Sequence, residues 1–165
     1  MNEPRITHIW ISPSTGEAIN AVETAEAVAD KGLVGDRYYL GKGYYSGDKI
    51  WDANVTFMEQ EAFDEASMGM DEPFSTSCLR RNIVTQGVDL HSLLGAKFKI
   101  GDAVFEGWKI WPPCNYINSL NPNRSVLKKF AKTAGIGAKV IQSGHFSVGD
   151  QIAVSYTHLT LPTKA

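Results

Sequence analysis

The sequence predicts a mainly β domain with a few short helices. Its apolar residues fall in short runs rich in β-branched and aromatic side chains, such as RITHIWI at 5–11, which is typical of strands. Fifteen glycines interrupt these runs and supply turns. Because a set of many short strands has edges that must be protected, we expect a closed or nearly closed β-barrel.

In the first half of the chain, the strand at 5–11 is closed by the turn-forming SPSTG. The good helix formers of AVETAEAVAD predict a helix at 21–30, although the apolar stripe is weak and a pair of strands fits as well. Glycines make 32–47 a long loop with short strand pieces. A strand is expected at 54–57 and a helix at 59–67, which has early acidic residues and a late glycine.

The second half returns to strand patterns, with one more helix. Strands are expected within LRRNIVTQG (79–87), AKFKIGDAVFEGWKI (96–110), GAKVIQSG (137–144) and FSVGDQIAV (146–154), with Gly-Asp turns at 101–102 and 149–150. The segment RSVLKKFAKTAG places Val126, Leu127, Phe130 and Ala131 on one face and lysines on the other, which predicts an amphipathic helix.

Length and charge limit the classes of protein to consider. The 165 residues suffice for one domain, which we assign to 1–153, and not for two. A net charge of -2 without a basic block argues against a nucleic-acid partner. No signal-peptide pattern and no apolar run of about 20 residues occurs, and two distant cysteines suit a reducing compartment, so we expect a cytoplasmic bacterial protein without membrane contact.

The last residues are set apart from the domain. The tail VSYTHLTLPTKA, 154–165, resembles the read-through translation of a sequencing adapter found at the ends of metagenomic gene sequences. The alternative is a native edge strand, because YTHLTL alternates acceptably. We expect the tail to be non-native and give it no functional weight.

Cys114 is the first candidate for chemistry. It follows Pro112 and Pro113 in WPPCNYINSLNP, directly after an expected strand. Prolines stiffen the backbone, so the direction of the thiol is set by the strand that precedes it. A buried structural cysteine is an equally good interpretation from these residues alone. Cys78 has no such frame and is expected to be structural.

Basic residues supply candidate anion-binding groups. Arg80 and Arg81 precede Asn82 at the start of an expected strand, so one arginine should face inwards and the other solvent. An inward guanidinium fits phosphate or carboxylate, whereas a surface ion pair is the alternative. Arg37, next to Asp36 in GLVGDRY, could approach a ligand or pin its loop, and we favour pinning. Arg124 could help a helix N-terminus to receive a phosphate.

Five segments in order resemble the MOSC family, the domain found at the C-terminus of molybdenum cofactor sulfurases and in free-standing bacterial proteins. They span about 32–153 and are GLVGDRY, VTFMEQEAF, RRNIVTQGVDLHSLLGAKFKIGDAVFEG, PPCNYINSLNP and GIGAKVIQSGHFSVGDQIAV. Single pieces such as GDR are weak signals. The strand RNIV followed by IGDA and then PC is specific to the family.

The resemblance implies a MOSC-type β-barrel and the molybdenum cofactor (molybdopterin), with Cys114 as molybdenum ligand or sulfur carrier. By similarity to mitochondrial amidoxime reducing proteins, Arg80 contacts the pterin and Asn82 matches the asparagine of the strand. Arg81 departs from the proline common there, so phosphate recognition could be shared between the two arginines. Asn115, beside the thiol, and Arg37 and Arg124 complete the expected cofactor-binding set.

Three functions follow from the resemblance. The first is a small molybdoenzyme that reduces N-hydroxylated or other N-oxygenated compounds and takes electrons from a partner flavoprotein or iron–sulfur protein, because the chain has neither four cysteines nor GxGxxG. The second is a persulfide carrier or sulfurtransferase supplied by a sulfur-donor protein. The third is a non-catalytic cofactor-binding module. A homodimer is one arrangement that the resemblance leaves open.

Overall fold

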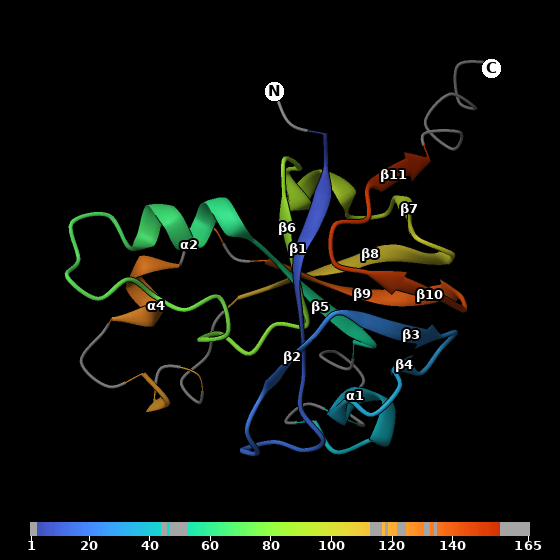
Figure 1. Ribbon diagram of the computed structural model, residues 1–165, viewed down its shortest axis with the longest axis horizontal. Helices are drawn as coiled ribbons and strands as arrows, with labels where there is room; N and C mark the ends of the chain where they lie inside the picture. The colour runs from blue at the N-terminus through green and yellow to red at the C-terminus, as the bar shows by residue number, and fades with distance from the viewer. Residues whose placement is uncertain are drawn as a thin grey trace.

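The computed structural model describes residues 3–43, 46, 53–112, 117, 119–121, 125–130, 133 and 135–155. Figure 1 shows a β-rich molecule with helices at its periphery. The strands are β1 Arg5–Ile11, β2 Asn20–Val22, β3 Thr24–Val28, β4 Gly32–Leu33, β5 Val55–Glu59, β6 Ile83–Gln86, β7 Lys97–Ile100, β8 Ala103–Trp111, β9 Gly135–Gln142, β10 Gly144–Ser147 and β11 Ile152–Ser155. The helices are α1 Arg37–Leu40, α2 Gln60–Ala66, the 3₁₀ helix η1 Leu90–Leu93 and α4 Val126–Lys129.

Two sheets build the fold. The larger has eight strands in the order β11-β7-β8-β9-β5-β6-β1-β2, and the smaller has three in the order β10-β3-β4. Every pair is antiparallel except β5 with β6. Parallel neighbours need a long crossover, and the segment containing α2 provides it.

The closed barrel expected from the sequence is not observed, since the described sheets are open. The reason lies in β1, whose outer edge is divided between two partners. Residues 9–11 pair with β2, whereas the beginning of the strand reaches the segment before β11 only through an isolated bridge between Arg5 and Gln151. Backbone hydrogen bonds from Ile6 N to Asp150 O (3.0 Å) and from Ile152 N to Pro4 O (2.8 Å) support this bridge. The large sheet therefore curls back onto its first strand without a continuous ladder.

Aromatic side chains fill the core between the two sheets. Phe57 packs edge-on against Phe98 and Phe105, with ring centroids 5.4 and 5.5 Å apart. Phe146 of β10 meets Phe105 edge-on at 5.8 Å. All four are almost fully buried. The small sheet is thus joined to the large one through a ring cluster of the kind that adds geometric preference to burial.

A second apolar cluster lies under the helices. Phe63 of α2 and Phe74 both pack against Phe130, with ring centroids 5.5 and 5.2 Å apart. Val126 and Phe130 are buried while Lys128 and Lys129 are exposed, as expected for the two faces of the second helix. Leu127 is half-buried, and Ala131 lies outside the described residues. The helical residues described there, Val126–Lys129, are fewer than the segment suggested.

The helix expected at 21–30 is wrong, and the alternative pair of strands is observed. Strand β3 pairs with β10 on one side and β4 on the other. It buries Ala27 completely while its neighbours in the strand remain partly or fully exposed. Helix propensity is a weak preference that pairing with two strands overrides.

The loop expected at 32–47 is wrong in part, because it contains the short helix α1, which Asp36 caps at its start and Gly41 ends. Most other expected elements are confirmed. Strands occupy the predicted positions in RITHIWI, ANVTF, AKFKIGDAVFEGWKI, GAKVIQSG and FSVGDQIAV, and α2 fills the predicted helix at 59–67. Turns separate β7 from β8 at 101–102 and β10 from β11 near 149. Strand β11 runs to Ser155, two residues beyond the boundary expected at 153, and 156–165 lie outside the described residues. No described helix has the length and apolar character needed to cross a membrane.

Candidate functional site

Arg80 and Arg81 lie just before strand β6, and both are buried. Arg80 is 9% exposed and Arg81 is 4% exposed. The expectation that one would face solvent is wrong, because β6 begins only at Ile83 and Arg80 has a φ of 58°. A positive φ is uncommon for a residue with a side chain and breaks the alternation of a strand. Both guanidinium groups therefore point into the protein.

The Arg80 guanidinium is held by neutral oxygens of the loop after β1. Its Nη1 donates to Glu17 O at 2.8 Å, and its Nη2 donates to Ser12 Oγ at 3.2 Å and Ser14 O at 3.4 Å. Carbonyl and hydroxyl acceptors orient a guanidinium without neutralising it. These bonds therefore fix the guanidinium of Arg80 in position.

Arg81 connects this segment to the end of β8. Its Nη2 donates to the carbonyl oxygen of Trp111 at 2.7 Å. Trp111 is the last residue of β8 and precedes the stretch PPC by one position. On the far side of that stretch, Asn121 Nδ2 donates to Cys78 O at 3.1 Å and to Ile117 O at 2.9 Å. Both flanks of the segment that contains the candidate thiol are therefore bonded to residues 78–81.

Asp36 and Arg37 form a buried ion pair that contacts the backbone at Arg80. Arg37 Nη1 lies 3.1 Å from Asp36 Oδ1, and the two side chains are 5% and 0% exposed. Arg37 Nη2 donates to the carbonyl of Arg80 at 2.7 Å. The guanidinium carbon also lies 4.8 Å from the ring centroid of Tyr38. These contacts fit the pinning role favoured from the sequence.

Asp36 also organises the backbone around it. Its Oδ1 accepts from Ser12 N at 3.0 Å, and its Oδ2 accepts from Tyr38 N at 3.2 Å as the N-cap of α1. One carboxylate thus joins the loop after β1, the first turn of α1 and the Arg37 guanidinium. The loop GLVGDRY therefore holds the backbone at Arg80 and the loop after β1 in place.

Asn82 is fully buried and links three strands. Its Oδ1 accepts from Thr56 N at 3.0 Å and Thr56 Oγ1 at 3.3 Å, while its Nδ2 donates to Trp10 O at 3.1 Å. The side chain therefore joins β5 to β1 across the start of β6. These described bonds give Asn82 an architectural task directly beside the arginines.

The arginine cluster, which we define as Asp36, Arg37, Arg80 and Arg81, carries three positive charges and one negative charge. The net charge of these four side chains is +2, in a protein whose total is -2. Burial reduces the dielectric screening of such charges, so an anion placed beside them is attracted more strongly than at the surface. The structure thus places Arg37, Arg80, Arg81 and Asn82 close together, and the proposal that they bind a cofactor stays a prediction.

Three expected site residues, Cys114, Asn115 and Arg124, lie outside the described residues. Three others were missed by sequence reasoning, namely Ser12, Trp111 and Asn121. Trp111 contributes its backbone carbonyl, for which no side-chain pattern exists, while Ser12 and Asn121 act through loops that the chain order does not place near the arginines. Among the described residues, no group of three or more His, Cys, Asp or Glu side chains could hold a metal ion.

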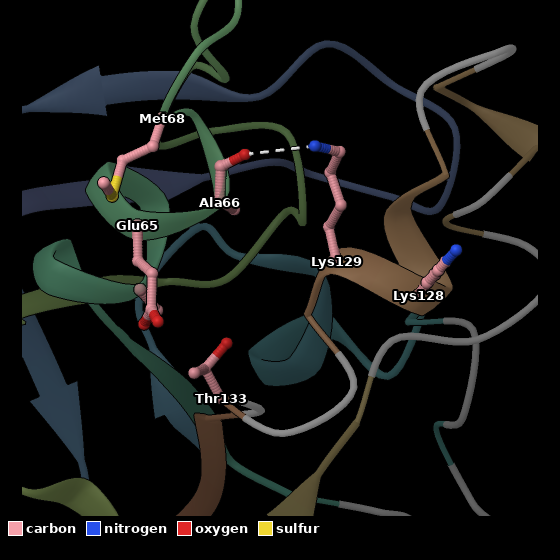
Figure 2. A pocket seen from close by; sticks show the side chains of 7 residues that line it. Glu65, Ala66, Met68, Lys128, Lys129 and Thr133 are labelled. Atoms are coloured by element: carbon pink, nitrogen blue, oxygen red, sulfur yellow. Dashed lines mark hydrogen bonds between the residues drawn. The ribbon is translucent and has the colours of Figure 1, made fainter.

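A separate pocket lies between α2 and α4, as Figure 2 shows. Its volume is about 330 Å³, and it is lined by Ala62, Glu65, Ala66, Met68, Lys128, Lys129 and Thr133. Lys129 Nζ approaches the carbonyl of Ala66, the last residue of α2, at 3.5 Å. An ammonium group at a helix C-terminus compensates the partial negative charge there. This contact explains Lys129 without a ligand.

Comparison with solved structures shows the same fold in three bacterial proteins. The YuaD protein from Bacillus subtilis has a TM-score of 0.73 at 17% identity, over 93% of this chain and 96% of that one. YiiM from Geobacillus stearothermophilus has a TM-score of 0.68 at 14% identity, over 92% of this chain and 75% of that one. YiiM from Escherichia coli has a TM-score of 0.67 at 18% identity, over 92% and 69%. Identities this low establish the fold alone.

No curated protein matches the chain. A family model described as the MOSC domain matches residues 30–153. The match includes the arginine cluster, the end of β8 and the segment around the candidate thiol.

Proposed function

The chain belongs to the MOSC domain family, and from this premise we propose that it binds the molybdenum cofactor and reduces N-hydroxylated or other N-oxygenated compounds. Cys114 is the proposed metal ligand. The supporting observation is that both flanks of its segment are bonded to residues 78–81: the carbonyl of Trp111 accepts from Arg81, and Asn121 donates to the carbonyl of Cys78. We also propose a cytoplasmic location, where a thiol stays reduced.

The described residues fit a cofactor with an anionic phosphate. Carbonyl and hydroxyl oxygens orient the guanidinium of Arg80, and the carbonyl of Trp111 orients that of Arg81. Planar guanidinium groups suit phosphate recognition. A single cysteine is a sufficient metal ligand only where the cofactor brings its own sulfur ligands, and a pterin dithiolene does so.

Each residue then has a task. Arg80 and Arg81 bind the phosphate, and Arg37 holds the backbone of Arg80 in place. Cys114 would bind the metal as a thiolate, the form that guanidinium charge favours. Asn115, next to the thiol, and Arg124 are proposed as further contacts of the cofactor. When bound, the cofactor supplies the two-electron redox chemistry.

The overall reaction is balanced as RNHOH + 2 e⁻ + 2 H⁺ → RNH₂ + H₂O, in which the N–O bond breaks and oxygen leaves as water. The chain has only two cysteines, so it cannot hold an iron–sulfur cluster with four cysteine ligands. We therefore propose that the electrons come from a partner protein, a flavoprotein or an iron–sulfur protein.

Metal content and activity test this proposal together. The protein is expressed in a host that makes the molybdenum cofactor, and molybdenum is measured by mass spectrometry beside reduction of an aryl amidoxime by a chemical donor. Cys114→Ser should lose molybdenum and activity, whereas the matched variant Cys78→Ser should keep both. If Cys114→Ala retains full metal content and full activity, the assignment is wrong.

The same experiment distinguishes the sulfur-carrier alternative. A protein without molybdenum that gains the mass of one sulfur atom after treatment with a cysteine desulfurase carries a persulfide. That gain must disappear in Cys114→Ser and persist in Cys78→Ser. If the protein carries neither molybdenum nor the added sulfur, a non-catalytic cofactor-binding module is the remaining interpretation.

A further inference from the structure

The outer face of the large sheet carries positive charge that the proposed site does not use. Strand β7 alternates, so that Lys97 and Lys99 are exposed while the residues after them are buried. The register places Lys97 opposite Glu106 of β8, and Glu106 opposite Lys139 of β9. Side chains opposite one another on neighbouring strands share a face of the sheet. We define the basic face as Lys97, Lys99, Glu106, Trp108, Lys109, Lys139 and Ile141.

Trp108 lies at the centre of the basic face. The register between β8 and β9 shifts between Gly107 and Lys109, which is the signature of a β-bulge. Lys139 Nζ is 4.2 Å and Lys109 Nζ is 5.4 Å from the centroid of the Trp108 ring. Ile141, 38% exposed, lies two residues along β9 from Lys139. A partly exposed tryptophan beside an exposed isoleucine is the composition of an interface centre, and lysines form its rim.

The charge of the face differs in sign from the rest of the molecule. Four lysines and one glutamate give the basic face +3, so the other residues carry -5 of the total of -2. These are four of the eleven lysines in the chain. A merely solvated sheet face needs polar residues but no single sign of charge. A face with a large net positive charge attracts acidic partners and speeds their association.

We propose that the basic face binds an acidic protein, the electron donor of the reaction. This inference rests on the proposed function, which requires an external donor. The position of the face supports it, because Trp108 and Trp111 lie on the same strand with ring centroids 6.4 Å apart. The carbonyl of Trp111 receives the hydrogen bond of Arg81. A donor on the basic face therefore contacts the strand that leads to the arginine cluster.

Binding is tested with two acidic probes, a flavodoxin and a [2Fe–2S] ferredoxin, by biolayer interferometry at about 20 and about 200 mM NaCl. At least one probe should bind at low salt and weaken at high salt. Lys97→Glu/Lys99→Glu/Lys139→Glu should weaken binding at least about tenfold, and Trp108→Ala should do so without a change of charge. The control Lys128→Glu/Lys129→Glu on α4 should change binding less than about twofold. Thermal unfolding of each variant verifies folding.

Three results would overturn the inference. They are the absence of salt-sensitive binding to both probes, equal weakening in the α4 control, and tighter binding of a single-stranded RNA than of either protein. Measuring reduction with two kinds of electron donor separates the test of docking from the test of the proposed reaction. With dithionite-reduced methyl viologen as donor, the triple variant should equal the wild type, whereas reduction driven by the bound probe should fall. Probe binding without reduction by any donor refutes only the reaction, and reduction by viologen without probe binding refutes only the docking.

Discussion

Replacing Asp36 with asparagine removes the one negative charge of the arginine cluster. The buried Arg37 guanidinium would then face an amide in place of a carboxylate. The amide also has only one oxygen, whereas Asp36 accepts from two backbone donors, Ser12 N and Tyr38 N, through two. Asp36→Asn therefore leaves a buried charge uncompensated and one backbone donor without its acceptor.

The expected cost follows from these two losses. Removing one partner of a buried ion pair costs about 3–5 kcal/mol. The Arg37 bond to Arg80 O and its contact with Tyr38 remain, so we take the lower end, about 3 kcal/mol. For a domain of this size the melting temperature should fall by about 6–12 °C.

Urea unfolding followed by circular dichroism measures this free energy of unfolding. The matched control is Asp150→Asn, because Asp150 Oδ2 accepts one backbone bond, from Ser147 N, in a turn. That control should cost about 1 kcal/mol or less. The double variant Asp36→Asn/Arg37→Met should be less destabilised than the sum of its single variants, since the uncompensated charge is gone. A loss below about 1 kcal/mol in Asp36→Asn, or strict additivity, would refute the reasoning.

Three further predictions concern other parts of the chain. Burial raises the pKa of Glu59 above its ordinary value of 4.5, so its contribution to stability is present below 4.5 and is lost as the pH rises through the raised value. Glu59→Gln keeps an acceptor for Leu90 N but removes the titrating group. The free energy of unfolding in urea should then depend less on pH across that window than in the wild type, and an equal pH dependence would contradict this. Gly107→Ala should destabilise by about 3 kcal/mol in thermal unfolding, because its Cβ would lie 2.1 Å from Leu93 O; wild-type stability would contradict the packing. Arg81→Met should lower the molybdenum content of the purified protein even at temperatures where its melting curve shows that it is folded. An unchanged molybdenum content would show that Arg81 does not bind the cofactor.

Most of the strands could be predicted because their pattern is local. β7 alternates between lysine and buried apolar residues, and β1 is a run of β-branched and aromatic side chains. Strand β3 could not be predicted with the same ease, because TAEAV is composed mainly of helix formers and becomes a strand through its pairing with β10 and β4. The split edge of β1 depends on two remote segments, so barrel closure could not be judged from local pattern.

The sequence proposed residues for the candidate site but could not give their geometry. The family motifs indicated Arg80, Arg81 and Asn82. The burial of both arginines depends on one backbone angle at Arg80, which no residue pattern announces. The bond from Arg81 to the carbonyl of Trp111 joins positions far apart in the chain, and a backbone acceptor has no sequence signature.

The bridge between Arg5 and Gln151 has a consequence for how the domain is made. These residues stand near opposite ends of the described chain, so their contact closes a very long loop and carries the corresponding entropy cost. During synthesis the bridge cannot form until the last strands have emerged from the ribosome, when the aromatic core strands are already available to pair. We expect the contact between the start of β1 and the start of β11 to form last. The amides of this contact, Ile6 and Ile152, should exchange hydrogen faster than those of β5 and β9.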